Sequence, residues 1–300
     1  MNMDEVTLNF NSESLLLLNF LLGFIMFGVA LDLRVEDFKR VLLNPKASLV
    51  GLISQWVILP IITLILIFIF EPSPSMALGM ILVACCPGGN ISNFISKLAG
   101  GDAALSVSLT ALTTSAAIFM TPFSFAFWSS FISSAESLKS SISLNVWDMF
   151  STILYLILIP VVLGVSFAKY KPQIANKIRK PVNILSIVIF AAFVVIAFMK
   201  NANYFIEFIH IIFVIVLFHN GLAFLSGYWM GKLSGLEEKE RKAISIETGI
   251  QNSGLGLVLI FNFFDGIGGM AIIAGWWGIW HIIAGLTIAF IWSGRKVFAQ

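Results

Sequence analysis

The residues of this chain that could bind an ion are one carboxylate and a set of side-chain oxygens inside apolar sequence. Glu247 begins the polar stretch ETGIQNSG (residues 247–254), and no Lys or Arg shares its depth in the surrounding apolar span. An unpaired carboxylate at bilayer depth costs on the order of 3 kcal/mol, so it must be neutralised by a cation or a proton. Glu247 is therefore the predicted centre of a cation or proton site.

The side chains that could join Glu247 favour sodium. They end in oxygen, the hard ligand that such cations prefer, whereas a transition metal would prefer His or Cys. Ser106 and Thr110 are four residues apart, so on a helix both hydroxyls lie on one face. Two local alternatives stay open: such hydroxyls bond to their own helix backbone, and Gln55 could pack two helices together. The candidate ligands from the residues alone are Ser92, Asn93, Ser106, Thr110, Thr248, Gln251 and Asn252.

Two polar, glycine-containing stretches predict broken helices. In CCPGGNISN (residues 85–93), Pro87 cannot donate a backbone hydrogen bond and two glycines follow it. The second stretch, residues 247–254, interrupts another span near Gly249. The N-terminus of each second half-helix carries unpaired N–H groups and a partial positive charge, which would suit an anionic ligand. The alternative for Pro87 is a simple kink.

The remaining polar groups at membrane depth are ambiguous. His219 with Asn220, and His281, are either satisfied structural side chains or parts of a proton relay or substrate contact. Asp102 follows two glycines and is predicted to cap the N-terminus of the next helix.

The composition indicates an all-α polytopic membrane protein. Of 300 residues, 58% are hydrophobic and 11% are charged, more apolar than one soluble core needs. Apolar runs of about 20 residues recur, the length of a membrane-spanning helix, whereas a barrel would show short alternating strands. Nine transmembrane helices are predicted at residues 14–31, 47–70, 75–99 (broken near Pro87), 102–132, 147–168, 182–200, 204–231, 239–263 (broken near Gly249) and 266–292.

The basic residues predict the topology. With the N-terminus outside and the C-terminus cytoplasmic, sixteen of the eighteen Lys and Arg residues fall in inside segments, leaving Lys139 and Lys200 outside. A multi-pass protein of the cell inner membrane is expected. Its partners would be membrane lipid and a transported molecule, with no obligate protein partner implied. The net charge of +2 shows no nucleic-acid footprint.

The two breaks predict an inverted repeat. They lie in the third and eighth spans, five elements apart, so these helices should run in opposite directions. Residues 1–132 would form a first repeat of four helices with its break at 87–90, lacking the first helix of the five. Residues 133–146 would link it to an inverted second repeat, 147–300, with its break at 248–252. Matching broken helices in inverted repeats are typical of secondary transporters.

Five segments resemble the bile acid:sodium symporter family, and the bacterial members most closely. They are residues 27–46 (FGVALDLRVEDFKRVLLNPK), 54–60 (SQWVILP), 85–112 (CCPGGNISNFISKLAGGDAALSVSLTAL), 218–227 (FHNGLAFLSG) and 246–255 (IETGIQNSGL). The resemblance implies a panel domain (about 14–70 and 147–200) beside a core domain (about 75–132 and 204–292) in which two broken helices cross. Bacterial members have ten helices, and this chain is expected to lack the first.

The resemblance also implies two sodium sites and a substrate crevice. The first site would use Ser92, Asn93, Ser106, Thr110 and Glu247. The second would use Gln55, Glu247, Gln251 and the backbone carbonyls of Thr248 and Ile250. The substrate would meet Asn90, Asn93, Asn252 and His281. Asn90 replaces the Thr of many members, and Ile282 replaces an Asn of bacterial relatives, so a bile acid is a less fitting substrate than a small carboxylate such as pantoate or a keto acid.

The leading hypothesis is sodium-coupled symport by alternating access of an organic anion, either a small carboxylate or a bile-acid-like anion, with two Na⁺ ions as the coupling ions. A cation/proton antiporter using Glu247 is the first alternative. An enzyme would need a nucleophile–base pair or a motif such as HExxH, and neither is present. A sensor would be expected to carry a cytoplasmic output domain.

Overall fold

The apolar runs fold into helices, because within a bilayer each backbone N–H and C=O must find a partner inside its own segment. The computed structural model describes residues 3–5, 12–33, 35–136, 138 and 146–294. No β-strand occurs in these ranges. The prediction of an all-α protein is therefore confirmed for the described part of the chain.

The helices follow one another along the chain with short connections. Their bounds are η1 (Met3–Glu5), α1 (Ser12–Ala30), α2 (Val35–Leu43), α3 (Pro45–Ile53), η2 (Ser54–Ile58), α4 (Leu59–Phe70), α5 (Pro74–Cys85), α6 (Ile91–Leu98), α7 (Ala103–Ser129), η3 (Ser133–Ala135), α9 (Val146–Ile153), η4 (Leu154–Leu158), α10 (Ile159–Tyr170), α11 (Pro172–Lys200), α12 (Ala202–Leu233), α13 (Glu238–Gly249), α14 (Ser253–Phe263) and α15 (Gly268–Trp292). Most of the predicted linker, residues 137 and 139–145, lies outside the described residues.

Five helices are long and apolar enough to cross a membrane by themselves. They are Pro45–Phe70, Ala103–Ser129, Trp147–Tyr170, Ile206–Leu233 and Gly268–Trp292. Shorter apolar helices cover Leu15–Ala30, Pro74–Cys85 and Ser253–Phe263. A multi-pass membrane protein accounts for these helices, while the count of nine spans and the inverted repeat stay predictions.

Two helices differ from the apolar pattern. α11 begins at Pro172, ten residues before the predicted start of 182. Its first turns carry polar and basic residues, which are helical here although they do not belong to the apolar run. α2 lies between the first two predicted spans, and is a short helix with charged residues on one side that packs against α7. Apolarity identifies the part of a helix that meets lipid, and it misses helical turns at the membrane surface.

Prolines explain the two irregular turns. The segments η2 and η4 are π-helical turns inside otherwise continuous helices, and each ends two residues before a proline, Pro60 or Pro160. A proline lacks the N–H that the preceding turn requires, so the hydrogen bonds there shift to a wider spacing. One of these turns holds Gln55, a candidate sodium ligand.

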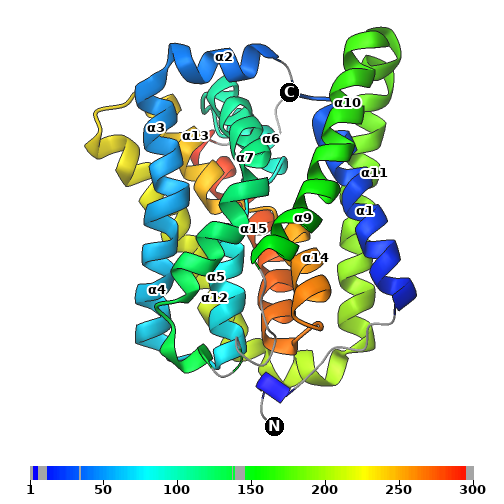
Figure 1. Cartoon of the computed structure of the whole chain (residues 1–300). Coiled ribbons are helices and arrows are strands. Elements are labelled where there is room, and N and C mark those ends of the chain that lie inside the picture. The colour runs from blue at the N-terminus through cyan, green and yellow to red at the C-terminus, as the bar shows by residue number, and fades with distance from the viewer. Residues whose placement is uncertain (1–2, 6–11, 34, 137, 139–145, 295–300) are drawn as a thin grey trace.

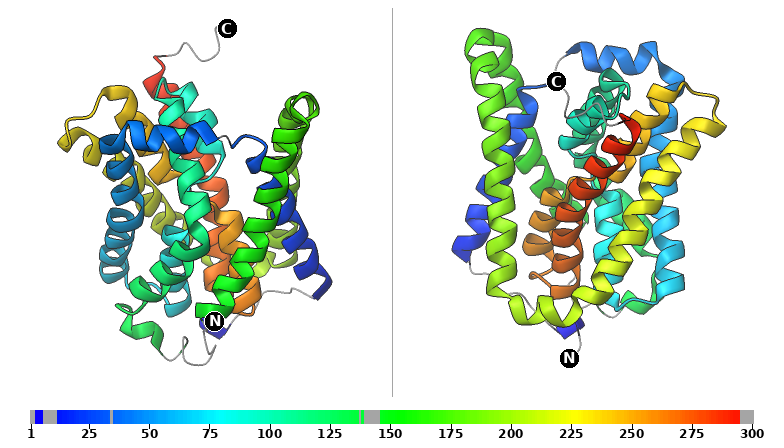
Figure 2. Two further views of the ribbon diagram at one scale, coloured as in Figure 1. Left: turned by 45° about the horizontal axis from the view of Figure 1, so that its top comes forward. Right: turned by 180° about the vertical axis from the view of Figure 1, so that it is seen from behind.

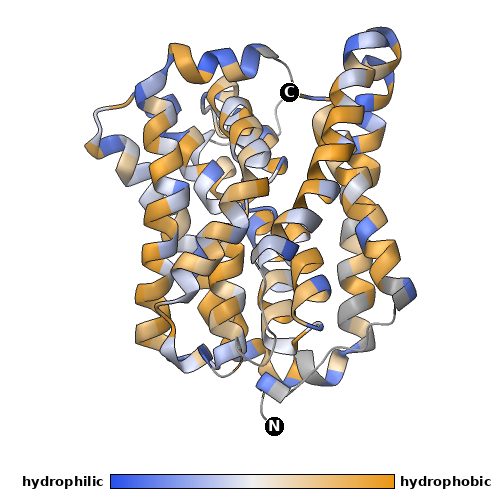
Figure 3. Ribbon diagram, viewed as in Figure 1, coloured by the Kyte–Doolittle hydropathy of each residue, from blue (hydrophilic) through white to orange (hydrophobic). Residues whose placement is uncertain are grey.

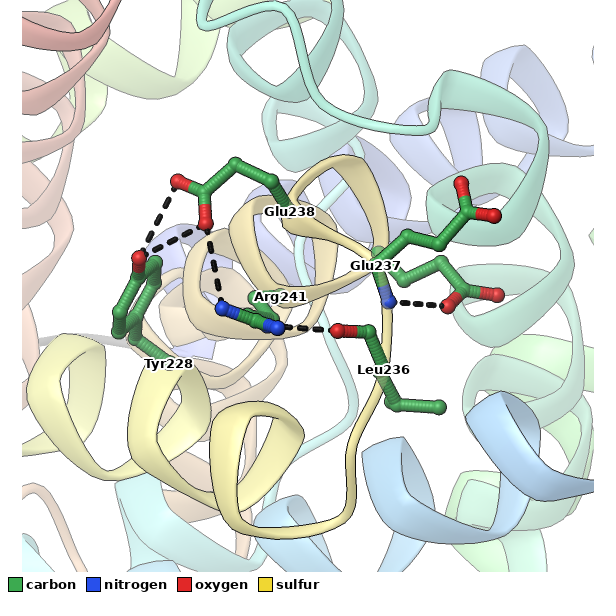
Figure 4. Close-up of polar contacts among 6 residues, drawn as sticks. Tyr228, Leu236, Glu237, Glu238 and Arg241 are labelled. Atoms are coloured by element: carbon green, nitrogen blue, oxygen red, sulfur yellow. Dashed lines mark hydrogen bonds and ion pairs between the residues drawn. The ribbon is translucent and has the colours of Figure 1, made fainter.

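The start of α13 is held by polar contacts at the α12–α13 turn (Figure 4). The Glu237 and Glu240 side chains form a reciprocal cap of the first turn. The Arg241 guanidinium donates to the Leu236 carbonyl at 2.6 Å, and the Tyr228 hydroxyl donates to Glu238 at 2.9 Å. These contacts set the point where the chain re-enters the bundle toward Glu247.

The helices divide into two groups (Figures 1 and 2). The side bundle consists of α1, α10 and α11, which pack on one another. The main bundle consists of α3 to α7 and α12 to α15. The packing of residues 45–70 differs from the prediction, which grouped this helix with α1: its main neighbours are α5, α7, α12 and α13, on the far side of the molecule. Two of its buried polar residues explain the difference, since Ser54 contacts Thr248 and Gln55 contacts Gln251 at the broken helix.

The basic segments collect at one end of the molecule. α2, the α10–α11 turn and the start of α13 lie at the top in Figure 1, and η1 lies at the bottom. Apolar residues cover most of the length of the long helices, and hydrophilic ones gather at α2 and the end turns (Figure 3). This arrangement agrees with the predicted grouping of Lys and Arg, although Arg34, Lys139, Arg295 and Lys296 lie outside the described residues.

Candidate functional site

The two helix breaks meet each other in the main bundle. The chain is extended at Cys86 and Ile250, and Gly88 pairs with Gln251 in an antiparallel bridge. Gly89 N–H donates to the Ile250 carbonyl at 2.8 Å, and Asn252 N–H donates to the Pro87 carbonyl at 2.8 Å. The breaks therefore satisfy some of each other's backbone groups, and irregular backbone persists at this depth where protein or water supplies such partners.

The observed breaks agree with the predicted ones. α5 ends at Cys85 and α6 begins at Ile91, around the predicted break at 87–90. α13 ends at Gly249 and α14 begins at Ser253, so the interruption at 250–252 lies within the predicted 248–252. The two interrupted helices run in opposite directions. The inverted repeat itself stays a prediction.

Close packing at the crossing requires glycine. A Cβ atom at Gly88 would collide with the Glu247 carboxylate, and one at Gly89 would lie 3.1 Å from the Gln251 carbonyl oxygen. The absence of side chains lets two backbones and a carboxylate occupy the same small volume.

Three hydroxyl groups surround the Glu247 carboxylate, which is 2% exposed. Ser92 Oγ donates to Oε2 at 2.6 Å, and Thr110 Oγ1 donates to Oε1 at 2.7 Å. Ser106 Oγ lies 3.2 Å from Oε2. These side chains come from α6, α7 and α13, so the structure brings together four of the five residues assigned to the first sodium site around one carboxylate.

The fifth residue, Asn93, completes a cluster of oxygens that has fewer hydroxyl hydrogens than short oxygen–oxygen contacts. Its Oδ1 lies 2.9 Å from Ser106 Oγ and 3.1 Å from Thr110 Oγ1. Thr110 Oγ1 is also 3.0 Å from the Ser106 carbonyl. Each hydroxyl has one hydrogen, so these short oxygen–oxygen approaches cannot all be hydrogen bonds at once. A cation among the oxygens would satisfy the surplus acceptors.

No basic side chain forms an ion pair with Glu247 within the described residues, where the ion pairs include Arg179 with Asp32 and Arg241 with Glu238. Nor do three or more His, Cys, Asp or Glu residues gather into a metal site in the same ranges. The hydrogen-bond donors to the carboxylate in this part of the chain are thus hydroxyl groups, which carry no charge to balance that of Glu247.

The second predicted sodium set is only partly assembled. Gln55 Nε2 donates to Gln251 Oε1 at 3.3 Å, and Gln251 Nε2 donates to the Thr248 carbonyl at 2.9 Å. The Ile250 carbonyl accepts the Gly89 N–H. Each predicted ligand therefore already has a protein partner, and Glu247 makes its hydrogen bonds with the first set. An ion here would share carbonyl oxygens that have a second lone pair free.

The four predicted substrate residues each have different contacts. Asn90 precedes α6 with no side-chain cap bond, while Asn252 caps α14 by accepting the Leu255 N–H at 3.1 Å. Asn93 belongs to the Glu247 cluster. His281 lies on α15, buried, and its Nδ1 has no hydrogen-bond partner among the described residues. No hydrogen bond joins His281 to Asn90 or Asn252 in that part of the chain.

The structure adds residues that sequence reasoning missed. Ser96 Oγ lies 3.2 Å from Ser106 Oγ, and Ser54 Oγ lies 2.9 Å from Thr248 Oγ1. Ser96 is one helical turn after Ser92, and Ser54 precedes Gln55, so spacing alone could have indicated both. The cap predicted for Asp102 is confirmed, since its carboxylate accepts Ala104 N–H at 2.9 Å.

Comparison with known proteins identifies related sequences. A model described as the Sodium Bile acid symporter family matches residues 19–208. An uncharacterized sodium-dependent transporter of Bacillus subtilis (strain 168), YocS, is 32% identical over 275 residues, covering 91% of this chain and 82% of that protein.

Plant proteins are similar over most of this chain. The probable sodium/metabolite cotransporter BASS1, chloroplastic, of Arabidopsis thaliana is 29% identical over 271 residues, which cover 89% of this chain and 64% of that protein. The corresponding BASS2 of Oryza sativa subsp. japonica is 30% identical over 244 residues, covering 81% and 56%. The chain thus spans less than two thirds of the length of these plant relatives.

Proposed function

The chain belongs to the sodium bile acid symporter family, and on this premise we propose that it is a secondary active transporter coupling sodium entry to uptake of an organic anion. The names of the relatives, a sodium-dependent transporter and sodium/metabolite cotransporters, support sodium as the coupling ion. The proposed substrate is a small carboxylate such as pantoate or a keto acid, carried by alternating access.

The observation that carries this proposal is the Glu247 cluster. A buried carboxylate is surrounded by hydroxyl and amide oxygens from three helices, with no basic partner among the described residues. A sodium ion in this cluster would neutralise Glu247 and join α6, α7 and α13 at the crossing. The first sodium site is accordingly assigned to Ser92, Asn93, Ser106, Thr110 and Glu247.

A second ion is assigned to the Gln55–Gln251 pair with the Thr248 and Ile250 carbonyls. Both glutamines are buried, and their amides already meet beside the α13 break. Binding there would tie η2 to the break, so the two ions together would stiffen the crossing. Such ordering by ions favours the conformation that accepts substrate.

The anion is assigned to the half-helix ends. The first turn of α6 at Asn90 and that of α14 at Asn252 offer partly positive N–H groups, and His281 offers a ring nitrogen. Sodium bound beside them would add positive charge and raise the affinity for a carboxylate. The N-terminus is assigned to the outside of the cell inner membrane and the C-terminus to the cytoplasm.

The test is sodium-dependent uptake in proteoliposomes, with Glu247→Gln as the variant. Glutamine keeps the shape of the side chain and removes the charge, so uptake at low sodium should fall at least about tenfold, the scale of a buried charge-assisted contact. Glu238→Gln is the matched control, because Glu238 lies on the same helix, half-exposed, outside the cluster. Full sodium-dependent uptake by Glu247→Gln would refute the proposal.

The same vesicles separate symport from cation/proton antiport. A symporter needs sodium and substrate on one side and moves no protons with sodium alone. An antiporter would acidify or alkalinise the lumen as soon as a sodium gradient is applied without substrate. A sodium-driven pH change abolished by Glu247→Gln would support the antiporter instead.

A further inference from the structure

The pair His219–Asn220 in α12 has no part in the proposed sodium and anion sites, although both side chains are fully buried. His219 Nε2 lies 2.7 Å from Thr63 Oγ1, and its ring packs on Trp277 with the centroids 4.6 Å apart. Asn220 turns toward another helix: its Nδ2 donates to the Gly249 carbonyl at 2.7 Å. Asn220 therefore reaches the break of α13 directly.

The Gly249 carbonyl needs such a partner because α13 ends there. The last carbonyls of a helix have no intrahelical donor. At this end the Thr248 carbonyl accepts the Gln251 side chain, and the Ile250 carbonyl accepts the Gly89 N–H. Both of those donors belong to the breaks themselves, whereas the Gly249 carbonyl is held by Asn220 from an uninterrupted helix.

The rest of the α12–α13 contact is close-packed. A Cβ at Gly249 would collide with the Phe224 ring, one turn after Asn220. A second hydrogen bond, from Ser245 Oγ to the Phe224 carbonyl at 2.6 Å, joins the helices one turn before the break. Asn220 thus lies where this rigid contact ends and the extended chain begins.

Stability alone does not account for an amide at this position. Its orientation is set by chemistry, because only the NH₂ group can face a carbonyl. Asn220 Oδ1 then has no hydrogen-bond partner among the described residues. An apolar side chain here would leave the Gly249 carbonyl oxygen unpaired. Asparagine pairs that oxygen but leaves its own Oδ1 unpaired, so the number of unpaired buried oxygens is the same. The hydrogen bond therefore matters for the position in which it holds the Gly249 peptide.

We infer that Asn220 is a positioning residue for sodium binding. By holding the Gly249 carbonyl, it sets the direction of the chain between Thr248 and Gln251, which supply ligands of the second proposed ion, and it anchors the helix end that carries Glu247. The inference rests on the proposed function, since it concerns the same sites.

The experiment measures the sodium concentration that half-saturates thermal stabilisation of the purified, full-length protein, with choline chloride keeping ionic strength constant and no substrate present. For Asn220→Ala the half-saturating concentration should rise at least about tenfold, the scale of a lost buried hydrogen bond. Ser245→Ala is the matched control: it removes the other interhelical hydrogen bond and should lower the melting temperature while leaving the half-saturating sodium within about twofold.

A second variant distinguishes loss of the hydrogen bond from misfolding caused by a smaller side chain. Asn220→Leu keeps a similar volume and removes the donor, and should give the same shift in sodium dependence. Unchanged sodium dependence in both Asn220 variants would overturn the inference, as would an equal shift in Ser245→Ala or failure of both Asn220 variants to fold while Ser245→Ala folds. A wild-type protein with no sodium response would overturn the proposed function as well, whereas a sodium response lost only in Glu247→Gln would overturn the role of Asn220 alone.

Discussion

At the scale of single residues, the cluster around Glu247 depends on hydroxyl groups that serve two purposes. Without an ion they donate hydrogen bonds to the carboxylate, and with one they can turn their lone pairs toward it. Thr110 has the most to contribute, because its oxygen lies within 3.1 Å of Asn93, Ser106 and Glu247 atoms. Replacing Thr110 by a residue of the same shape without the hydroxyl would therefore distinguish the contribution of the oxygen from that of side-chain packing.

Thr110→Val is expected to raise the half-saturating sodium for uptake at least about tenfold, since a hydrogen bond to a charged group contributes about 1.5–3 kcal/mol. Thr114→Val is the control, one turn further along α7 and equally buried. Uptake at a series of sodium concentrations checks the prediction. Equal shifts in both variants would point to a packing effect and count against Thr110 as a ligand.

At the scale of elements, the site exists because two helices stop where they cross. The bridge between Gly88 and Gln251 replaces hydrogen bonds that each helix loses at its break. The crossing holds Glu247 against a residue that has no side chain. Its geometry is therefore sensitive to a single methyl group.

Gly88→Ala should displace the Glu247 carboxylate and abolish sodium stabilisation, because a well-packed interior has no space for the added Cβ. The melting temperature without sodium should fall as well, by the equivalent of about 1–3 kcal/mol. Gly221→Ala provides the contrast: a Cβ there meets no atom within 4 Å, and alanine is the better helix former. Thermal unfolding with sodium or choline measures both, and a sodium response retained by Gly88→Ala would contradict the prediction.

At the scale of the whole molecule, a polar contact between α1 and α14 joins the side bundle to the main bundle. Asn19 on α1 and Asn262 on α14 exchange hydrogen bonds of 3.3 and 2.9 Å. If the two bundles rock against each other during the proposed transport cycle, this contact must open in one of the two states. A comparable bond within the side bundle, from Asn183 to Asp32 at 2.6 Å, would stay closed throughout.

A reversible thiol cross-linker across Asn19→Cys and Asn262→Cys, with Cys85→Ala and Cys86→Ala as background, should reduce uptake to the sodium-free level. Reductant should restore it. Cross-linking Asp32→Cys to Asn183→Cys in the same background should leave uptake within about twofold, because rigid bodies tolerate internal links. Normal uptake by the cross-linked Asn19–Asn262 pair would argue that these bundles do not move apart.

Much of the architecture follows from local sequence. Apolar runs identify the long helices, and Pro87 with its glycines identifies the first break to within a residue or so. The oxygen-bearing side chains around Glu247 were predictable by type, because a lone carboxylate in apolar sequence restricts the partners available to it. Helix breaking and hydrophobic burial act through neighbours along the chain, so the sequence by itself carries this information.

The tertiary structure alone decided which of those residues meet. Ser92 and Glu247 are 155 residues apart, and their contact depends on how α6, α7 and α13 pack around the crossing. The same packing places residues 45–70 in the main bundle and directs Asn220 to Gly249. No local pattern reports such contacts, because side-chain volumes and backbone partners are matched only when distant helices come together.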